Sequence, residues 1–408
     1  MLFNNFTMAE GDPVDSIDED GSNYEISGVD SDGDSSDDFL DENAQLSEDS
    51  DDSSDSSGIE EEDSLISAIE NRKEVQQTKP SPIKSDDLFT DISFHPSCEI
   101  IAMSCLSGNI EIHSYSIEEN VLKGSIEAHT KSCRAIEFST DGRTLYSVGQ
   151  DKNVIYSDIE TLDITMFINK AHHGPLTALC VPDEHVLVTG CEEGVMKMWD
   201  TRDTKYTVLK AHDAQDYISC ITCKDSYKIA CSSGDGTLGT YDLRAKRRLH
   251  YSAPIKSDLT CCTSAHYDRQ VVCGSMMGKY IFFNWEDASE PSGTYKPRVK
   301  SPINCVLQVS DNLVLSGCQD GNIRAYHFFP HKLVGLVGHH TLTVEKLDVS
   351  HDGALVASLS PDPIVKFWDI SYLEGFDVTS AEKCKGEDAA NLPSSEFDDR
   401  KSFFSDLL

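Results

Sequence analysis

The sequence lacks the features of a membrane or secreted protein. No run approaches the ~18 consecutive apolar residues that suggest a membrane span, and Met1–Thr7 has neither the basic start nor the apolar stretch of a secretory signal. We therefore expect an intracellular protein in a reducing compartment. The 14 cysteines should then act mostly as small buried hydrophobic residues.

The sequence also lacks the short motifs of common enzymes. It contains no GxxxxGK[ST] phosphate loop, no GxSxG nucleophile turn and no HExxH zinc motif. Paired carboxylates are abundant near the N-terminus, but no fixed separation is expected there, and acid–base catalysis requires one. We predict that the protein is not an enzyme and has no catalytic residue, cofactor or metal ligand.

Basic residues are scarce and unevenly spread. The chain holds 34 Lys and Arg against 71 Asp and Glu, a formal net charge of −37. Residues 1–75 carry 25 acidic side chains against only Arg72 and Lys73. Such a segment cannot bury enough apolar surface to offset its backbone entropy, so we predict a disordered acidic arm over residues 1–84. The arm either binds basic proteins or only keeps the chain soluble, and the overall acidity disfavours direct binding to nucleic acid.

The rest of the chain is built from repeats that end in a Trp-Asp-like pair. The seven closing positions, at intervals of 42 to 44 residues, are Ser114, Asp158, Asp200, Asp242, Asn284, His327 and Asp369. This period matches the WD repeat, in which four antiparallel strands make one propeller blade. We predict an all-β, seven-bladed WD40 β-propeller over residues 85–372, with residues just before Leu88 closing blade seven. A flexible tail follows over residues 373–408.

Each WD blade can bury a hydrogen-bonded set of His, Ser or Thr, Asp and Trp, since polar groups are costly to bury alone. We expect these residues to be structural. By blade, the candidates are His129, Ser147 and Asp151 (two), His172, Thr189 and Trp199 with Glu193 in the Asp place (three), His212 and Asp235 with Cys231 in the hydroxyl place (four), Ser316 and Asp320 (six), and Ser358, Asp362 and Trp368 with either His339 or His340 (seven). Only blade seven offers all four partners.

Two blade endings carry an Arg after the closing Asp. Trp199-Asp200-Thr201-Arg202 is echoed by Tyr241-Asp242-Leu243-Arg244. A Trp-Asp-x-Arg box resembles the one by which some WD proteins dock onto the DNA-damage-binding adaptor of cullin-4 ubiquitin ligases, and Arg offers a planar fork to such a partner. An ordinary repeat ending is the alternative, and we favour it. The dense basic cluster 244–248 is either a nuclear-import signal or a solvated turn.

Two features remain outside the repeat pattern. Cys220 and Cys223 form a lone CxxC pair without further zinc ligands nearby, and residues three apart in a strand face opposite sides, so we expect a structural role. At the C-terminus, Phe403, Phe404 and Leu407 with Leu408 have the spacing of one face of a short docking helix.

The local sequences of the repeats resemble those of one family. Similar segments, in collinear order, are SCRAIEFSTDGRTLYSV (132–148), DLT (258–260), FNW (283–285), DGNIRAY (320–326), VGLVG (334–338) and SFFSDLL (402–408). They are similar to the WD repeat-containing protein 55 family, whose relatives include a fungal ribosome-biogenesis factor. The basic run often seen in that family is here reduced, around 375–400, to Lys383 and Lys385, with Arg400 at the end of this stretch.

The resemblance implies a scaffold in the nucleus, and there in the nucleolus, that modulates rRNA synthesis and ribosome production. Its expected partners are ribosome-biogenesis or rRNA-transcription proteins, bound by a single chain within larger complexes. A substrate receptor of a cullin-4 ubiquitin ligase is the alternative. The repeat pattern by itself predicts only an interaction scaffold, because one propeller fold hosts many functions.

Overall fold

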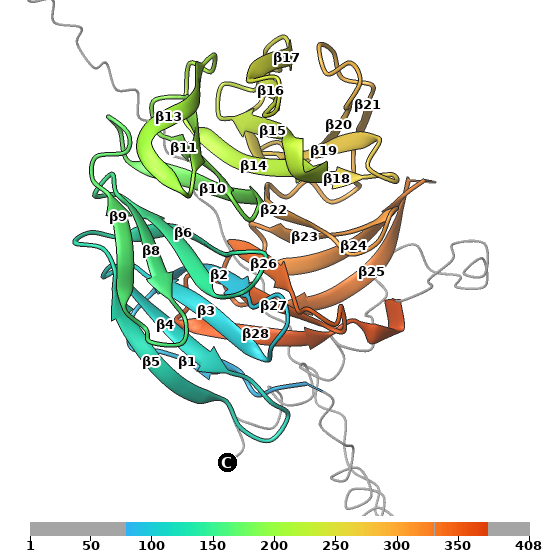
Figure 1. Cartoon of the computed structure of the whole chain (residues 1–408). Helices are drawn as coiled ribbons and strands as arrows, with labels where there is room; N and C mark the ends of the chain where they lie inside the picture. Colours follow the sequence, from blue (N-terminus) through green and yellow to red (C-terminus); the bar gives the residue numbers. More distant parts are fainter. Residues whose placement is uncertain (1–78, 330, 374–408) are drawn as a thin grey trace, which may run out of the picture. The chain divides into compact units, whose positions relative to one another are not determined.

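The computed structural model describes residues 79–329 and 331–373. These residues form seven four-stranded antiparallel sheets arranged around a ring (Figure 1). In this part of the chain the helical elements are two 3-10 turns, η1 (Asp225–Tyr227) and η2 (Ser371–Leu373), and no helix is long and apolar enough to cross a membrane. The predicted all-β, seven-bladed propeller is confirmed.

In blades one to six the strands follow chain order from the ring axis to the rim, whereas in blade seven β26, β27 and β28 are followed at the rim by β1. Blades one to three contain β2 (Phe89–Phe94), β3 (Ile100–Cys105), β4 (Asn109–Ser114) and β5 (Val121–Glu127); β6 (Cys133–Phe138), β7 (Thr144–Gly149), β8 (Val154–Asp158) and β9 (Ile164–Ile168); and β10 (Leu176–Asp183), β11 (Val186–Cys191), β12 (Val195–Asp200) and β13 (Asp203–His212). Blades four and five contain β14 (Ile218–Lys224), β15 (Lys228–Ser233), β16 (Leu238–Asp242) and β17 (Arg247–Tyr251); and β18 (Leu259–Ala265), β19 (Gln270–Ser275), β20 (Tyr280–Asn284) and β21 (Gly293–Tyr295). Blades six and seven contain β22 (Ile303–Gln308), β23 (Leu313–Cys318), β24 (Asn322–Phe328) and β25 (His331–His339); and β26 (Lys346–Val349), β27 (Leu355–Leu359), β28 (Ile364–Asp369) and β1 (Ile83–Lys84).

The predicted closing positions lie where the third strands end. Six of them are the last residue of their strand, and His327 is followed by one more strand residue, Phe328. The regular period therefore located every blade correctly, because each Trp-Asp-like pair lies at or next to the end of the third strand of its blade.

Blade seven is closed by the opposite end of the folded region. In β1, Ile83 pairs with Val365 and Lys84 pairs with Ile364 of β28. The residues that close blade seven therefore lie just before Leu88, as predicted, although the predicted start of the propeller at residue 85 leaves them out. Two residues are too few to show the alternation by which a strand is recognised in a sequence.

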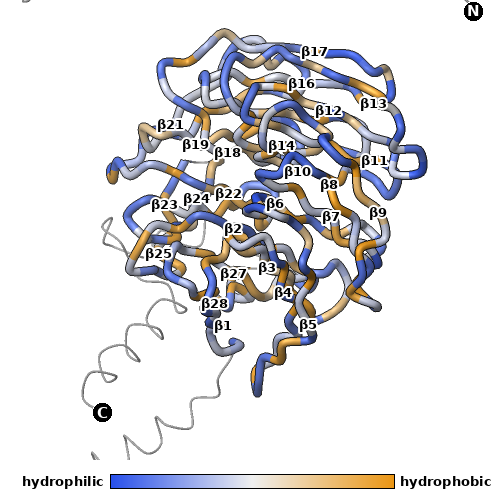
Figure 2. The backbone as a smooth tube through the Cα atoms, turned by 90° about the vertical axis from the view of Figure 1, so that its left-hand side faces the viewer, coloured by the Kyte–Doolittle hydropathy of each residue, from blue (hydrophilic) through white to orange (hydrophobic). Residues whose placement is uncertain are grey.

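The hydrophobic core lies between neighbouring blades. Ala230 and Leu238 of blade four, for example, pack with Cys262, Val271 and Phe283 of blade five. Figure 2 shows hydrophobic stretches within the strands of the blades, and second strands such as β3 and β23 are buried along almost their whole length because a neighbouring blade covers each face of the sheet. Each blade is therefore stabilised mainly by its two neighbours in the ring.

Side-chain hydrogen bonds also join the innermost strand of one blade to the start of the next innermost strand or, for Val344, to the residues just before it. They connect Thr90 to the carbonyl of Cys133 (2.7 Å), Thr177 to that of Ile218 (2.7 Å), Thr260 to that of Ile303, and Asn304 to that of Val344 (3.1 Å). The donors occupy matching positions near the start of the first strand. These contacts satisfy carbonyl groups that face the neighbouring blade rather than a strand partner.

Candidate interaction surfaces

Blade seven joins all four side chains of the repeat set. His340 Nε2 lies 2.7 Å from Ser358 Oγ, and Trp368 Nε1 donates to the same oxygen over 2.7 Å. His340 Nδ1 lies 3.5 Å from the Asp362 carboxylate. The repeat histidine is therefore His340, whereas His339 is the last residue of β25. The Ser358 hydroxyl is the centre of this set, because the buried rings of His340 and Trp368 both form a hydrogen bond with it.

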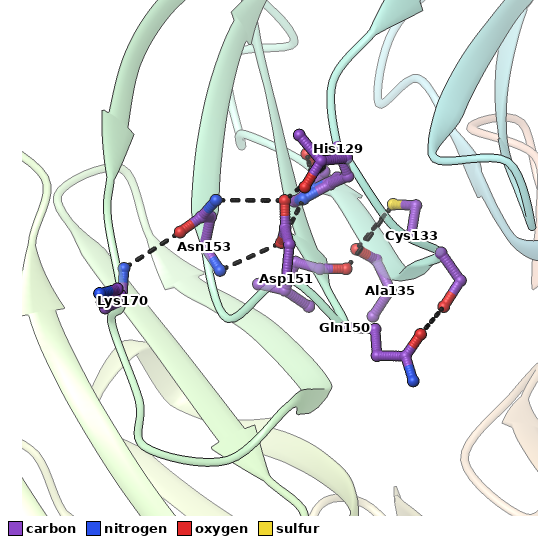
Figure 3. A network of polar contacts seen from close by, with 11 residues as sticks. His129, Cys133, Ala135, Gln150, Asp151, Asn153 and Lys170 are labelled. Carbon is purple, nitrogen blue, oxygen red and sulfur yellow. Dashed lines mark hydrogen bonds and ion pairs between the residues drawn. The ribbon is translucent and has the colours of Figure 1, made fainter.

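Blade two contains the set without a Trp. His129 lies 3.0 Å from Ser147 Oγ and 2.9 Å from the Asp151 carboxylate. Figure 3 shows Asp151 between His129 and Asn153, with Asn153 in turn accepting the backbone N–H of Lys170. The carboxylate thus links the blade to the loop that leads into blade three.

Blade three contains the set without the carboxylate contact. His172 Nε2 lies 2.8 Å from Thr189 Oγ1, which also accepts from Trp199 Nε1 over 2.9 Å. The other ring nitrogen, His172 Nδ1, has no hydrogen-bond partner among the described residues, so Glu193 does not replace the Asp. Burial lowers the pKa of His172 to about 3, which keeps the ring neutral at physiological pH.

The prediction for blade four is wrong at His212. This residue ends β13 opposite Val195 and is exposed. The carbonyl of Ala214 lies against Gly194 as the carbonyl of His129 lies against Gly108, so Ala214 occupies the place of the repeat histidine. The Ala-His pair in the sequence falls two residues too early, because the position of the repeat histidine is set by strand pairing and not by the dipeptide.

A different polar set replaces the missing one in blade four. The Asp213 carboxylate accepts from Tyr241 Oη over 2.9 Å and from Arg248 over 2.6 Å, and its carbonyl accepts from Tyr251 Oη over 2.8 Å. Tyr241 stands in the place of the blade-three Trp. The carboxylate of Asp235 instead accepts the N–H groups of its own turn and of the neighbouring loop, at Thr237 and Gln215.

In blade six the two predicted residues share no hydrogen bond. Ser316 Oγ accepts from Tyr280 of blade five over 2.7 Å. Asp320 forms a two-pronged ion pair with Arg324, a largely buried residue four positions on. Blade six therefore satisfies its two predicted residues separately, because no histidine connects the hydroxyl of Ser316 to the carboxylate of Asp320.

The first Trp-Asp-x-Arg ending folds back on itself. Arg202 Nε donates to Asp200 over 2.9 Å and Nη2 donates over 2.7 Å, so both carboxylate oxygens are engaged by one guanidinium. The hydrogen bond from Arg202 lowers the pKa of Asp200 to about 2. Arg202 is exposed, but its guanidinium group already forms a bidentate ion pair with Asp200 in the same loop. A partner carboxylate would have to compete with Asp200 for it.

The second ending and the basic cluster are also engaged locally. The Arg244 guanidinium lies 4.1 Å from the ring centroid of Tyr227, and the Asp242 carboxylate accepts the N–H of Ala245 over 2.9 Å. At the other end of the cluster 244–248, Arg248 binds Asp213. The cluster therefore does not present a row of side chains with a common direction.

The CxxC cysteines belong to two different packing clusters. Cys220 packs with Cys262 between blades four and five, and Cys223 packs with Cys180 between blades three and four. This is the opposite-facing arrangement expected for residues three apart in a strand. No group of three or more His, Cys, Asp or Glu able to hold a metal occurs within residues 79–329 and 331–373.

Sequence reasoning missed a charged cluster on the innermost strands. Lys346 of β26 lies 3.6 Å from Asp91 of β2, and Asp91 also accepts a backbone N–H of β6 over 2.9 Å. Burial raises the pKa of Asp348 to about 7 and that of Glu137 to about 8. A charged residue within an otherwise apolar first strand was the available signal, but it belongs to no motif.

Glu137→Gln should reduce the pH dependence of stability. Because burial raises the pKa of Glu137, its stabilising contribution is present below its ordinary value of 4.5 and is lost as pH rises through about 8. Over that interval we expect the free energy of unfolding of the native chain to fall more than that of the variant, because each unit of pKa difference between the folded and unfolded states corresponds to about 1.4 kcal/mol. Urea denaturation at a series of pH values measures this. Glu127→Gln, at an exposed glutamate of β5, is the control, and equal slopes for all three proteins would contradict the assignment.

Several predicted sites lie outside the described residues. These are the acidic arm up to residue 78 and, in the tail, Phe403, Phe404 and Leu407. Their roles remain predictions from the sequence.

Comparison with known proteins gives a consistent result. The family model described as WDR55 matches residues 80–373, a range that includes β1. A WD repeat-containing protein 55 homolog of Drosophila erecta is 35% identical over 347 residues, covering 84% of this chain and 68% of the relative. The homolog of Aedes aegypti is 33% identical over 350 residues, 85% of this chain and 74% of the relative. The homolog of Drosophila willistoni is 33% identical over 430 residues, 98% of this chain and 85% of the relative.

Proposed function

Since this chain belongs to the WD repeat-containing protein 55 family, we propose that it is a non-enzymatic scaffold of the nucleolus that supports rRNA synthesis and ribosome production. The observation that supports this most is the family match, which extends over the whole propeller. Its partners are proteins of ribosome assembly or rRNA transcription, held by a single propeller within a larger complex.

The way the polar side chains are used supports a scaffold. In blades two, three and seven the histidines and hydroxyls bind one another inside the blade. This buried arrangement stabilises the fold and holds no reacting group at a surface of these blades. Binding is left to the loops and rims, where a rigid ring can hold several partners at once.

Depletion of the protein tests this proposal. We expect cells without it to synthesise less rRNA, measured by pulse labelling, and to recover when the full chain is restored. The restored chain should concentrate in the nucleolus. Unchanged rRNA labelling after depletion, or a chain that stays outside the nucleus, would reject the proposed role.

The alternative is a substrate receptor of a cullin-4 ubiquitin ligase, which the exposed positions of Arg202 and Arg244 favour. Two local contacts oppose it, since one guanidinium binds Asp200 and the other stacks on Tyr227. Under the scaffold proposal these two arginines stabilise their local structure through Asp200 and Tyr227 and do not bind a partner.

The double substitution Arg202→Ala/Arg244→Ala should therefore leave the bound proteins almost unchanged. We expect the recovery of ribosome-assembly proteins to change by less than about twofold, because exposed charge contacts contribute little. Quantitative affinity purification measures it, with the highly exposed Arg143→Ala as the matched control. Selective loss of a cullin-4 adaptor in the double variant alone would favour the receptor.

A further inference from the structure

Three loops meet over blade five, on the face of the ring that carries the connections between successive blades. They are residues 256–258, 276–279 and 296–301. The N–H of Met276 donates to the carbonyl of Asp258 over 3.1 Å, and the backbone of Ser301 lies directly against Gly278. The three loops thus form one continuous surface, which we call the blade-five patch.

The blade-five patch exposes large apolar side chains. Met276, Met277 and Val299 are 51%, 53% and 52% exposed. In five other blades the place of Met277 holds a carboxylate, namely Asp151, Glu193, Asp235, Asp320 or Asp362. Blade five has Ile255 in the place of the repeat histidine, so it needs no carboxylate there. The loss of the carboxylate does not explain why two exposed methionines, Met276 and Met277, occupy this loop, since a small polar residue would also fit the fold.

The same patch is strongly basic in a chain whose net charge is −37. Its three loops contain Arg298 and four lysines, Lys256, Lys279, Lys296 and Lys300, against the single carboxylate of Asp258. The corresponding loops of blade three carry the opposite charge, with Glu192, Glu193 and Asp216. Positive charge is therefore concentrated where apolar side chains are exposed.

We propose that the blade-five patch binds an acidic peptide segment of a partner protein, in which large apolar side chains are flanked by Asp or Glu. The lysines attract and orient the carboxylates, and the flexible methionines pack against apolar side chains of varied shape. A single-stranded nucleic acid is less suited, because such ligands stack on aromatic rings and these loops contain none. This contact depends only on the propeller surface and holds whatever process the scaffold serves.

Fluorescence anisotropy with the full chain tests this. The probe is a short labelled peptide in which Phe-Leu is flanked on both sides by Asp and Glu. We expect saturable binding that Lys256→Glu/Lys300→Glu weakens about tenfold or more, and that Met276→Ser/Met277→Ser weakens about fivefold. All four side chains are on the surface, so the melting temperatures of both variants should match that of the native chain.

The matched control is Lys131→Glu/Lys170→Glu, two exposed lysines in the equivalent loops at either side of blade two. This variant should bind the peptide as the native chain does. Equal weakening by the control would indicate general charge attraction and overturn the proposal. So would failure of the peptide to bind, including the case in which oligouridine RNA binds instead and depends on Lys256 and Lys300.

Discussion

Ser358→Ala should lower the free energy of unfolding of the propeller by about 3 kcal/mol. The Ser358 hydroxyl is the atom at which His340 and Trp368 meet, each at 2.7 Å, and all three side chains are buried. The substitution removes this partner from both rings where water cannot replace it. A buried donor or acceptor that loses its partner costs more than a hydrogen bond contributes on average.

Ser157→Ala is the matched control for this prediction. Ser157 is fully buried in blade two, stands in the place that Trp368 has in blade seven, and has no hydrogen-bond partner among the described residues. We expect its replacement to change stability by less than about 1 kcal/mol. Chemical denaturation of both variants beside the native chain makes the measurement. Similar losses at the two serines would show that the blade-seven set does not stabilise the fold as described.

Removal of residues 1–84 should destabilise the propeller far more than removal of residues 1–78. The longer deletion takes away β1, leaves the edge of β28 unpaired, and removes Ile83 from a cluster that contains Val365 and Phe367. It also removes Lys79, whose ammonium lies 4.3 Å from the Trp368 ring centroid. Loss of one buried Ile with the pairing that closes the ring should cost about 4 kcal/mol.

Thermal melting of the two truncated proteins beside the full chain tests this prediction. Ile83→Asp in the full chain provides a version that keeps the chain length, with Ile117→Asp at an exposed position as its control. We expect the 1–84 deletion and Ile83→Asp to melt well below the other three proteins. If both deletions melt together, β1 does not close the ring.

The blade pattern could be predicted because it repeats. Each of the seven closing positions lies at or next to the end of a third strand. Because the interval between them is regular, one poorly matching repeat does not change the predicted number of blades. The side-chain sets within the blades were less predictable. His212 follows an Ala as His129 does, yet the pairing of β12 with β13 places Ala214 where the histidine is expected. Sequence spacing does not reveal such a shift of two residues.

Other features depend on contacts between distant segments. The pair of Lys346 and Asp91 forms only because the first strands of blades seven and one are neighbours in the closed ring. The replacement set of Asp213, Tyr241 and Arg248 likewise joins a loop, a third strand and a fourth strand. The blade-five patch also depends on contacts between three separate loops, which the strands of the blade bring together.

Quantitative affinity purification from nuclear extract tests the central proposal most directly. It compares the full chain with a chain that ends at Leu373, the last described residue of the propeller. If the protein is a scaffold of ribosome production, ribosome-assembly proteins will be the dominant partners of the full chain, and loss of the tail with Phe403 and Phe404 will reduce them. A cullin-4 adaptor as the dominant partner of both chains, with ribosome-assembly proteins absent, would contradict the account.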